Sequence, residues 1–403
     1  MDEKKRNVPK IRFPGFTDEW ERRKLGGCFD ERQERSAEGE LISVTINEGI
    51  KKFSELGRHD NSSEDKSHYK KVEVGDIAYN SMRMWQGASG YSPYSGILSP
   101  AYTVAVPKSD VDSLFFSYVF KRPQMIHTFQ ISSQGITSDT WNLKFPAFSE
   151  IETMLPKIEE QRQIAACFKQ LDTLLTLHQR KLDHLKELKK GLLQKMFPKN
   201  GASVPEIRFP GFTDAWEQRK LSEITDKVTE KNAGLQYVET FTNSAEFGII
   251  SQRDFFDHDI AKLGSLDGYY IVKNEDFVYN PRISTSAPVG PINRNKLGRT
   301  GVMSPLYTVF RPHDIDTTYL EYFFKCGYWH SFMNFNGDSG ARSDRFSIRD
   351  NVFFQMPIPI PDIDEQRKIG ELLTCLDNLI TLHQRKVDHL KELKKGLLQQ
   401  MFV

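Results

Sequence analysis

The sequence is poor in cysteine: it has four in 403 residues, and no two of them form a Cys-x-x-Cys pair. A disulfide scaffold or a structural zinc site requires closely spaced cysteines. The scattered positions of Cys28, Cys167, Cys326 and Cys375 therefore argue against both, and they predict a protein of the reducing cytoplasm.

Long apolar runs and a strong net charge are also missing. No hydrophobic stretch approaches the ~18 residues that a membrane span needs, and residues 1–6 contain no apolar signal region. Hydrophobic residues make up 38% and charged residues 27% of the chain, which fits a soluble protein. The net charge of +1 gives no global support for nucleic-acid binding, so any such function must rest on local features.

Signatures of catalysis are absent from the sequence. There is no GxxxxGK[ST] phosphate loop, no GxGxxG motif and no nucleophile elbow. Asn280-Pro281 is followed by Arg282, so it is not the Asn-Pro-Pro-aromatic string of amino-methyltransferases. The acidic residues form no recognisable metal cluster. We therefore expect a chain that recognises a ligand and holds no catalytic residue, metal or cofactor of its own.

What the sequence does contain is an internal repeat. The segment Val8–Trp20 returns with few changes as Val204–Trp216, and Asp183–Gln194 returns unchanged as Asp388–Gln399. The middle of each copy differs. A repeat of about 190 residues is far too long for a solenoid unit and predicts two copies of one globular domain plus one helix. Such a scaffold suits two different recognition surfaces.

The repeat predicts an α+β protein in which two similar mixed α/β domains are separated by an antiparallel two-helix coiled coil with pseudo-twofold symmetry. The expected boundaries are residues 1–157 for the first domain, 158–198 for the first helix, 199–362 for the second domain and 363–403 for the second helix.

The two helical arms show a heptad pattern when Leu171 is placed at position a, with Lys181 interrupting one d position. A domain lies between the arms, so antiparallel pairing with one domain at each end is favoured; the alternative is that each arm packs alone on its own domain. Histidines at equivalent a positions are expected to fix the register. The predicted seam consists of Leu171, Leu174, His178, Leu185, Leu188 and Leu192 in the first arm, and Leu376, Leu379, His383, Leu390, Leu393 and Leu397 in the second.

The stretch from His178 to Phe197 is rich in lysine and arginine. Two interpretations stay open: a solvated face of the coiled coil, or a surface that docks a partner or follows phosphates.

Alternating apolar residues predict strands at 41–46, 71–79 and 102–106 in the first domain and at 270–279 and 307–310 in the second. A helix is expected near 113–129 and again near 318–335. Short strings that recur in both domains, such as Ser-Pro-x-Tyr-Thr-Val and acidic-Glu-Gln-Arg, are interpreted as framework.

The loops between these recurring strings differ, and they carry Arg, Gln, Asn, Ser and Thr on glycine-punctuated segments. Such residues make base-edge and phosphate contacts, although ordinary surface loops contain them too. The candidate DNA-binding residues are Arg83, Trp85, Gln86, Ser133, Gln134, Thr137 and Ser138 in the first domain, and Arg282, Ser284, Arg294, Arg299, Arg342 and Arg345 in the second.

The duplicated frame, the Ser-Pro-x-Tyr-Thr-Val string, the Pro-x-x-acidic-Glu-Gln helix start and the terminal Leu-Lys-Lys-Gly-Leu-Leu-Gln-x-Met-Phe arm together resemble the specificity subunit of bacterial type I restriction-modification systems. The resemblance covers essentially the whole chain. It implies two target-recognition domains held apart by a coiled coil, each reading one half of a bipartite, asymmetric double-stranded DNA site.

The same resemblance implies partners. Two modification subunits would dock on the helices and carry S-adenosylmethionine for adenine N6-methylation. Restriction subunits would add ATP- and Mg-dependent translocation and cleavage. The main alternative is a coiled-coil scaffold that binds only proteins; it explains the arms but not the divergent polar loops. A stand-alone nuclease or methyltransferase is disfavoured by the missing motifs.

Overall fold

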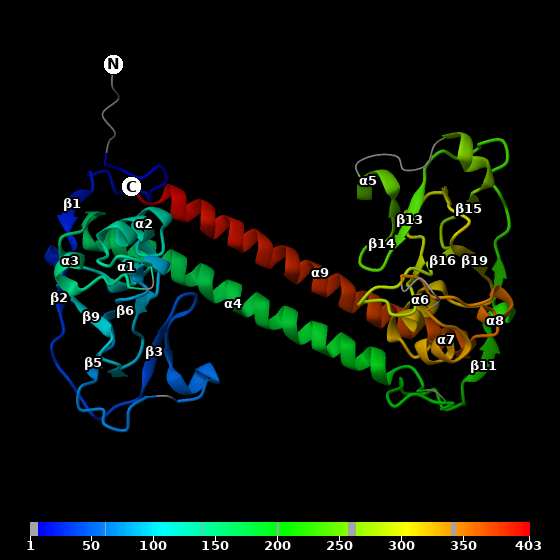
Figure 1. Cartoon of the computed structure of the whole chain (residues 1–403), viewed down its shortest axis with the longest axis horizontal. Helices are drawn as coiled ribbons and strands as arrows, with labels where there is room; N and C mark the ends of the chain where they lie inside the picture. Colours follow the sequence, from blue (N-terminus) through cyan, green and yellow to red (C-terminus); the bar gives the residue numbers. More distant parts are fainter. Residues whose placement is uncertain (1–6, 61, 139, 200, 257–262, 340–343) are drawn as a thin grey trace, which may run out of the picture. The chain divides into compact units, whose positions relative to one another are not determined.

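The computed structural model describes residues 7–60, 62–138, 140–199, 201–256, 263–339 and 344–403 (Figure 1). The chain divides into two compact units, residues 1–180 with 384–403 and residues 181–383. Each unit contains one globular domain and part of each long helix. No helix within the described residues has the length and apolarity needed to cross a membrane.

The first domain is built on a four-stranded antiparallel sheet in the order β2–β9–β6–β7. Its strands are Phe29–Glu31, Tyr102–Pro107, Ile77–Asn80 and Ser89–Tyr91. Three strand pairs accompany it: β1 with β10 (Glu21–Lys24, Glu152–Leu155), β3 with β4 (Ile42–Thr45, Gly49–Lys52) and β5 with β8 (Lys70–Val72, Gly96–Leu98). Helices α1 (Ser113–Val119), α2 (Pro123–Ser132) and α3 (Phe145–Ser149) supply aromatic residues to one core.

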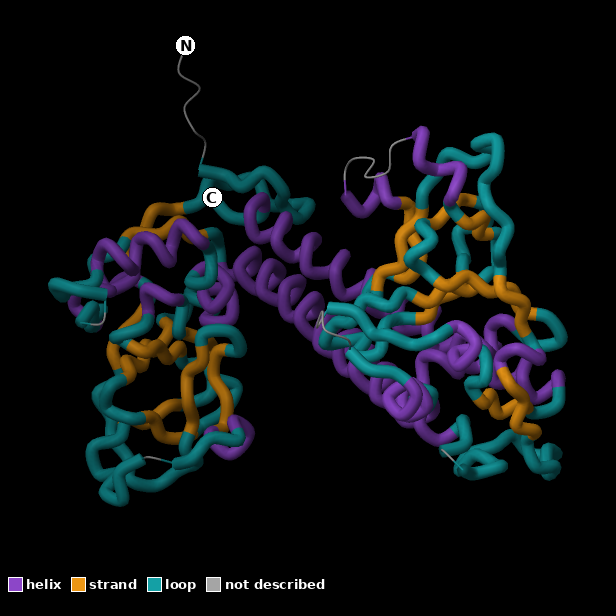
Figure 2. Tube along the Cα trace, turned by 45° about the vertical axis from the view of Figure 1, so that its right-hand side comes forward, coloured by secondary structure: helices purple, strands orange, loops and turns teal. Residues whose placement is uncertain are grey.

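The second domain repeats this topology strand for strand. Its sheet has the order β12–β19–β16–β17, with strands Thr225–Lys227, Thr308–Pro312, Phe277–Tyr279 and Ile292–Arg294. The accompanying pairs are β11 with β20 (Glu217–Lys220, Pro357–Ile360), β13 with β14 (Phe241–Ser244, Gly248–Ser251) and β15 with β18 (Tyr270–Val272, Gly301–Met303). The helices are α5 (Gln252–Phe256), α6 (Thr317–Cys326), α7 (His330–Asn336) and α8 (Asp350–Phe353). Figure 2 shows helices and strands mixed in both domains, so the α+β prediction is confirmed.

Four predicted elements turn out to be interrupted. The strand expected at 71–79 is β5 and β6 with a turn between them, where Gly75 has φ +99°. Glu275, with φ +72°, divides β15 from β16 in the same way. The helix expected at 113–129 breaks before Pro123, whose missing N–H suits the first turn of a new helix. The helix expected at 318–335 ends at Gly327, a left-handed cap with φ +79°.

The recurring acidic-Glu-Gln-Arg string is framework, as predicted. Glu160, whose side chain is buried, accepts two hydrogen bonds from the Arg12 guanidinium, at 2.6 and 2.8 Å. Its neighbour Gln161 accepts from the N–H of Asp112, the N-cap of α1. The second domain repeats these contacts with Arg208, Glu365, Gln366 and Asp316. The string therefore anchors the segment around Arg12 or Arg208 and the start of helix α1 or α6.

Two long helices, α4 (Ile158–Lys195) and α9 (Ile363–Gln400), have 38 residues each. In the first unit they pack antiparallel, because Asp172 on α4 pairs with Lys394 on α9, and Phe168 lies 5.8 Å from Phe402, just past the end of α9. In the second unit Lys189 of α4 pairs with Asp377 of α9. Pairing of the arms is thus confirmed within each unit.

A Tyr–Asp–Lys cluster ties each domain to these helices. In the first unit the hydroxyl of Tyr118 donates to Asp172 at 2.9 Å, while Lys394 pairs with the same carboxylate and lies 5.5 Å from the ring centre. Burial, and then the charge of Asp172, raise the pKa of Tyr118, which keeps its hydroxyl a donor. The second unit has the same cluster, built from Tyr322, Asp377 and Lys189.

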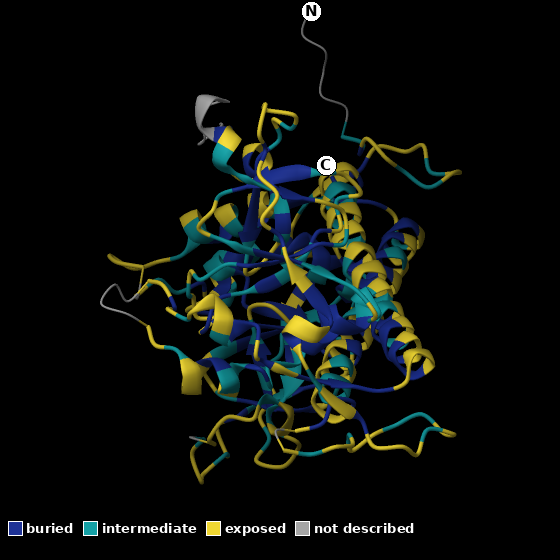
Figure 3. Cartoon of the chain, turned by 90° about the vertical axis from the view of Figure 1, so that its right-hand side faces the viewer, coloured by how far each residue is buried: buried dark blue, intermediate teal, exposed yellow. Residues whose placement is uncertain are grey.

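The predicted heptad phase is wrong at most d positions. Leu174, Leu188 and Leu393 are 43%, 42% and 40% exposed. Leu182 and Val387, each with 1% exposure, are buried one residue after the d positions occupied by Lys181 and Lys386. Of the other predicted seam residues, Leu171, Leu185, Leu376 and His383 are buried, and His178, Leu192, Leu379, Leu390 and Leu397 are half-buried. In Figure 3 much of the outer surface of the long helices is exposed, whereas the strands inside the domains are mostly buried.

Candidate nucleic-acid interface

In each domain the structure joins two variable loops that lie far apart in the sequence. We call residues 81–87 with 132–142, apart from 139, the first loop pair. We call residues 281–286 with 337–347, apart from 340–343, the second loop pair. Both begin with an asparagine turn, in which Asn80 accepts from the N–H of Met82 and Asn280 from that of Arg282, each at 3.0 Å.

Backbone hydrogen bonds close the first loop pair. The N–H of Leu143 donates to the carbonyl of Ser81 at 2.8 Å. The rings of Trp85 and Trp141 meet edge to face, 5.2 Å apart. Gln134 and Asn142 exchange two backbone hydrogen bonds and close the longer segment as a narrow hairpin. Two loops thus form one surface.

The second loop pair is closed at the equivalent place. The N–H of Phe346 donates to the carbonyl of Pro281 at 2.7 Å, and the N–H of Ile283 donates to Asp344 at 3.0 Å. Arg282 and Arg345 lie opposite each other across this bridge. The two domains therefore present different side chains from the same position on one frame.

The predicted residues differ in how accessible they are. Trp85, Gln86 and Ser133 are half-buried, and the hydroxyl of Ser133 donates to Phe129 in α2. Arg342 lies outside the described residues. The exposed candidates are Arg83, Gln134, Thr137, Ser138, Arg282, Ser284, Arg299 and Arg345.

The exposed arginines differ in whether a carboxylate pairs with them. Arg299 forms a bidentate pair with Glu239, at 2.7 and 2.8 Å, and this hydrogen bonding lowers the pKa of Glu239. The guanidinium group of Arg83 donates a hydrogen bond to the side chain of Gln86 at 3.2 Å. Arg282 and Arg345 have no ion-pair partner anywhere in the described part of the chain. Unpaired guanidiniums on one loop pair can bind phosphate or the O6/N7 edge of guanine.

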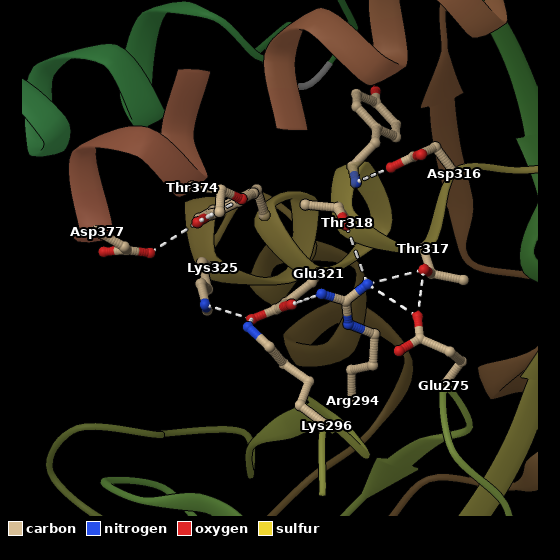
Figure 4. Close-up of polar contacts among 12 residues, drawn as sticks. Glu275, Arg294, Lys296, Asp316, Thr317, Thr318, Glu321, Lys325, Thr374 and Asp377 are labelled. Atoms are coloured by element: carbon tan, nitrogen blue, oxygen red, sulfur yellow. Dashed lines mark hydrogen bonds and ion pairs between the residues drawn. The ribbon is translucent and has the colours of Figure 1, made fainter. Parts of the chain in front are cut away.

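Arg294 belongs to a buried ion network, which corrects its assignment to an exposed loop surface (Figure 4). Its side chain is 8% exposed and pairs with Glu321 at 2.6 Å and with Glu275 at 3.0 Å. Lys325 also pairs with Glu321, at 2.6 Å. Burial alone would raise the pKa of Glu321, but Lys325, Arg294 and Lys296 lower it below the ordinary carboxyl value.

Replacing Glu321 with glutamine should destabilise the second domain by about 3 kcal/mol near neutral pH, because buried Arg294 would lose its closer ion pair and keep only the one with the more exposed Glu275. A lowered pKa means that the wild-type contribution is present above the ordinary carboxyl range and is lost as the pH falls through the folded value. The difference between variant and wild type should therefore shrink in acid.

Chemical unfolding at several pH values measures this effect. The matched control, Glu239→Gln, breaks the more exposed pair with Arg299 and should cost less than about 1 kcal/mol. If both variants lost the same free energy of unfolding, the Arg294–Glu321 network would not stabilise the domain more than an exposed ion pair does.

A pocket that the sequence analysis did not predict lies beside the second loop pair. The pocket has a volume of about 540 Å³ and is lined by the β13–β14 hairpin, α5 and the 281–286 loop. Its lining includes the polar residues Asn243, Gln252 and Asn280 and the rings of Phe255 and Phe256. Only the polar composition of the hairpin could have indicated it. Within the described residues there is no group of acidic, histidine or cysteine side chains able to hold a metal.

The family comparison agrees with two copies of one domain. The family model described as "Type I restriction modification DNA specificity domain" matches the chain twice, over residues 17–187 and 213–392. The chain belongs to this family.

Two curated relatives of the specificity family are similar along most of their length. The specificity subunit of the type I restriction enzyme MjaVIII from Methanocaldococcus jannaschii is 24% identical over 353 residues, which cover 82% of this chain and 81% of that protein. The putative MjaX specificity subunit of the same organism is 21% identical, with 98% and 95% coverage.

A solved structure shares the specificity-subunit fold. It is the crystal structure of the type I restriction-modification S subunit from M. genitalium, which matches with a TM-score of 0.57 at 12% identity, covering 98% of this chain and 99% of that one. At this identity the likeness concerns the fold alone.

Proposed function

We propose that this chain is the DNA-recognition subunit of a type I restriction-modification complex, in which each domain reads one half of an asymmetric bipartite site. The observation that carries the proposal is the repeated frame with two equivalent but chemically different loop pairs. Two identical loop pairs would suit a palindrome, whereas different ones suit two different half-sites.

The chemistry of the loop pairs supports base readout. Arginine donates in bidentate fashion to guanine, and glutamine and asparagine pair with adenine, so Arg83, Gln86, Arg282 and Arg345 are suitable readers. The half-buried Trp85–Trp141 pair gives the first loop pair a stiff apolar base. Each lost base contact should cost ~1–3 kcal/mol.

We further propose that α4 and α9 set the unspecified gap between the two halves. Each has 38 residues and therefore spans roughly 57 Å at 1.5 Å per residue. The Tyr–Asp–Lys clusters support this role because each fixes a domain to the adjoining helix ends.

Two equivalent basic grooves support docking of two modification subunits. One has a volume of about 420 Å³ and lies where α9 meets the start of α2, and the other, of about 370 Å³, lies where α4 meets the end of α6. Lysines, a leucine and a glutamine at matching positions line them: Lys391, Lys394, Lys395, Leu398 and Gln399 in the first groove, and Lys186, Lys189, Lys190, Leu193 and Gln194 in the second. These residues belong to the segment that is identical in the two repeats, and two matching helix surfaces suit two copies of one acidic partner. The rest of the lining differs, with Lys121 and Arg122 in the first groove and Lys325 and Asp377 in the second.

Charge reversal in one groove should remove one modification subunit from the complex. Lys391→Glu with Lys395→Glu alters the first groove, and Lys186→Glu with Lys190→Glu alters the second, so each double variant is the matched control of the other. Native mass spectrometry should find one modification subunit per chain instead of two in either case. Two subunits bound in both variants would show that the grooves are not docking sites.

In this proposal the catalytic chemistry belongs to the partners. The modification subunits carry S-adenosylmethionine and methylate adenine N6, and the restriction subunits carry ATP and Mg. The chain itself is a non-catalytic member of the complex and works in the cytoplasm.

The competing function, a scaffold that binds only proteins, is separated by salt dependence. The affinity of a DNA reader for duplex DNA falls steeply as salt rises, because phosphate contacts release counterions. We expect that behaviour of the complex with modification subunits. A complex that forms but binds no duplex at low salt would support the scaffold.

A further inference from the structure

Lys121, in the first domain, connects two segments that are distant in the sequence. Lys121 follows α1, and its ammonium group donates to the carbonyl of Ile46 at 2.7 Å and to the carbonyl of Gly87. Ile46 lies in the turn of the β3–β4 hairpin. Gly87 is the last residue of the 81–87 loop, in a left-handed conformation with φ +79° that ends a 3-10 turn at 84–86.

The environment of this lysine is unusual for a cation. No carboxylate forms an ion pair with Lys121 in the described part of the chain, and its two bonded acceptors are backbone carbonyls. Burial, and then the nearby charge of Lys394, lower the pKa of Lys121 to about 8. Lys121 is half-buried, and no carboxylate offsets the cost of partly desolvating its charge. Its clearest structural effect is to join the β3–β4 hairpin to the 81–87 loop.

The equivalent lysine of the second domain makes different contacts. Lys325 pairs with Glu321 at 2.6 Å and lies 4.8 Å from the ring centre of Tyr322. In the first domain the position of Glu321 is occupied by Ser117, whose hydroxyl donates to its own helix at Leu114. Among the described residues, Lys121 bonds to its recognition loop, whereas Lys325 bonds to Glu321.

The second loop pair is held by another residue. Asn243, in the β13–β14 hairpin, donates to the carbonyls of Val278 and Pro291, at 2.7 and 3.3 Å. Asn280, which starts the second loop pair, donates in turn to the carbonyl of Asn243 at 2.8 Å. Each domain thus fastens its hairpin to its recognition loop, but with different chemistry.

We infer that Lys121 is a positioning residue for base readout by the first domain, and that it acts by fixing the Gly87 end of the loop that carries Arg83, Trp85 and Gln86. The inference rests on the proposed DNA-recognition function. Lys121 makes no base contact in this account. Its two hydrogen bonds fix the position of Gly87 relative to the β3–β4 hairpin. The side chains of the 81–87 loop therefore meet the base edges in one arrangement.

The test is Lys121→Met in the full chain, co-expressed with the modification subunit. Methionine keeps the length of the side chain and removes the donors. Mapping of N6-methyladenine should show that discrimination at one or more bases of a single half-site falls about tenfold, while the other half-site is unchanged. The thermal midpoint should change little, because the half-buried ammonium group has no carboxylate partner to lose. The matched control, Lys325→Met, should leave the half-site read by the first domain intact.

The outcomes separate the inference from the proposed function. Unchanged discrimination in both half-sites overturns the positioning role. Relaxation of both half-sites together with a lower midpoint also overturns it, because that pattern reports general loosening of the fold. If the wild-type complex itself yields no bipartite motif, the proposed function fails and the inference falls with it.

Discussion

Exchanging Ser81–Gly87 for an unrelated loop of equal length is expected to change the bases read in one half of the DNA site and to leave the other half intact. The loop supplies Arg83, Trp85 and Gln86, and it closes on the 132–142 segment through Leu143 and Trp141. With ~1–3 kcal/mol per lost contact, two lost contacts lower selectivity at that half about thirtyfold or more. Methylation mapping before and after the exchange measures the change.

The matched exchange in the second domain is residues 281–286. It should alter the opposite half-site and spare the first, because each loop pair is built entirely within its own domain. A shift of both half-sites after either exchange would contradict separate reading by the two domains.

Inserting one heptad into both long helices should lengthen the gap between the half-sites by about three base pairs. Seven residues add ~10 Å of helix, and duplex DNA rises 3.4 Å per base pair. Insertion after Arg180 in α4 and after His383 in α9 falls at the boundary between the two units and preserves both Tyr–Asp–Lys clusters. Both half-site sequences should be unchanged.

A heptad in α4 alone is the control for this experiment. It leaves seven unmatched residues opposite α9 and should abolish methylation or reduce it strongly. If the double insertion gives a complex that methylates with the original gap, the helices do not determine the spacing.

Repetition made much of this fold predictable from the sequence. The recurring strings identified two equivalent domains, and Glu160 with Gln161 shows why such strings recur: they hold the segment around Arg12 and the start of α1, as their equivalents hold Arg208 and the start of α6. The long helices were predictable because apolar residues recur over many turns. Short strands and their pairing order were visible only in part, because turns at Gly75 and Glu275 interrupt otherwise apolar runs.

Tertiary contacts decided what the sequence left open. Neighbouring leucines such as Leu174 and Leu175 allow two heptad phases one residue apart, and only the packing of α4 against α9 selects between them. Arg294 and Arg282 both look like loop arginines in the sequence. In the structure Arg294 is buried in an ion pair with Glu321, whereas Arg282 is exposed. Lys121 carried no motif at all, since its partners are backbone carbonyls.

The most direct test is a map of N6-methyladenine in host DNA when this chain is co-expressed with a type I modification subunit. We expect one asymmetric motif with two specified halves and a fixed gap, methylated on both strands. Methylation of a palindrome would mean that the same domain reads both halves of the site, once from each copy of a dimer. A stable complex that produces no new methylation would contradict the account and favour a scaffold.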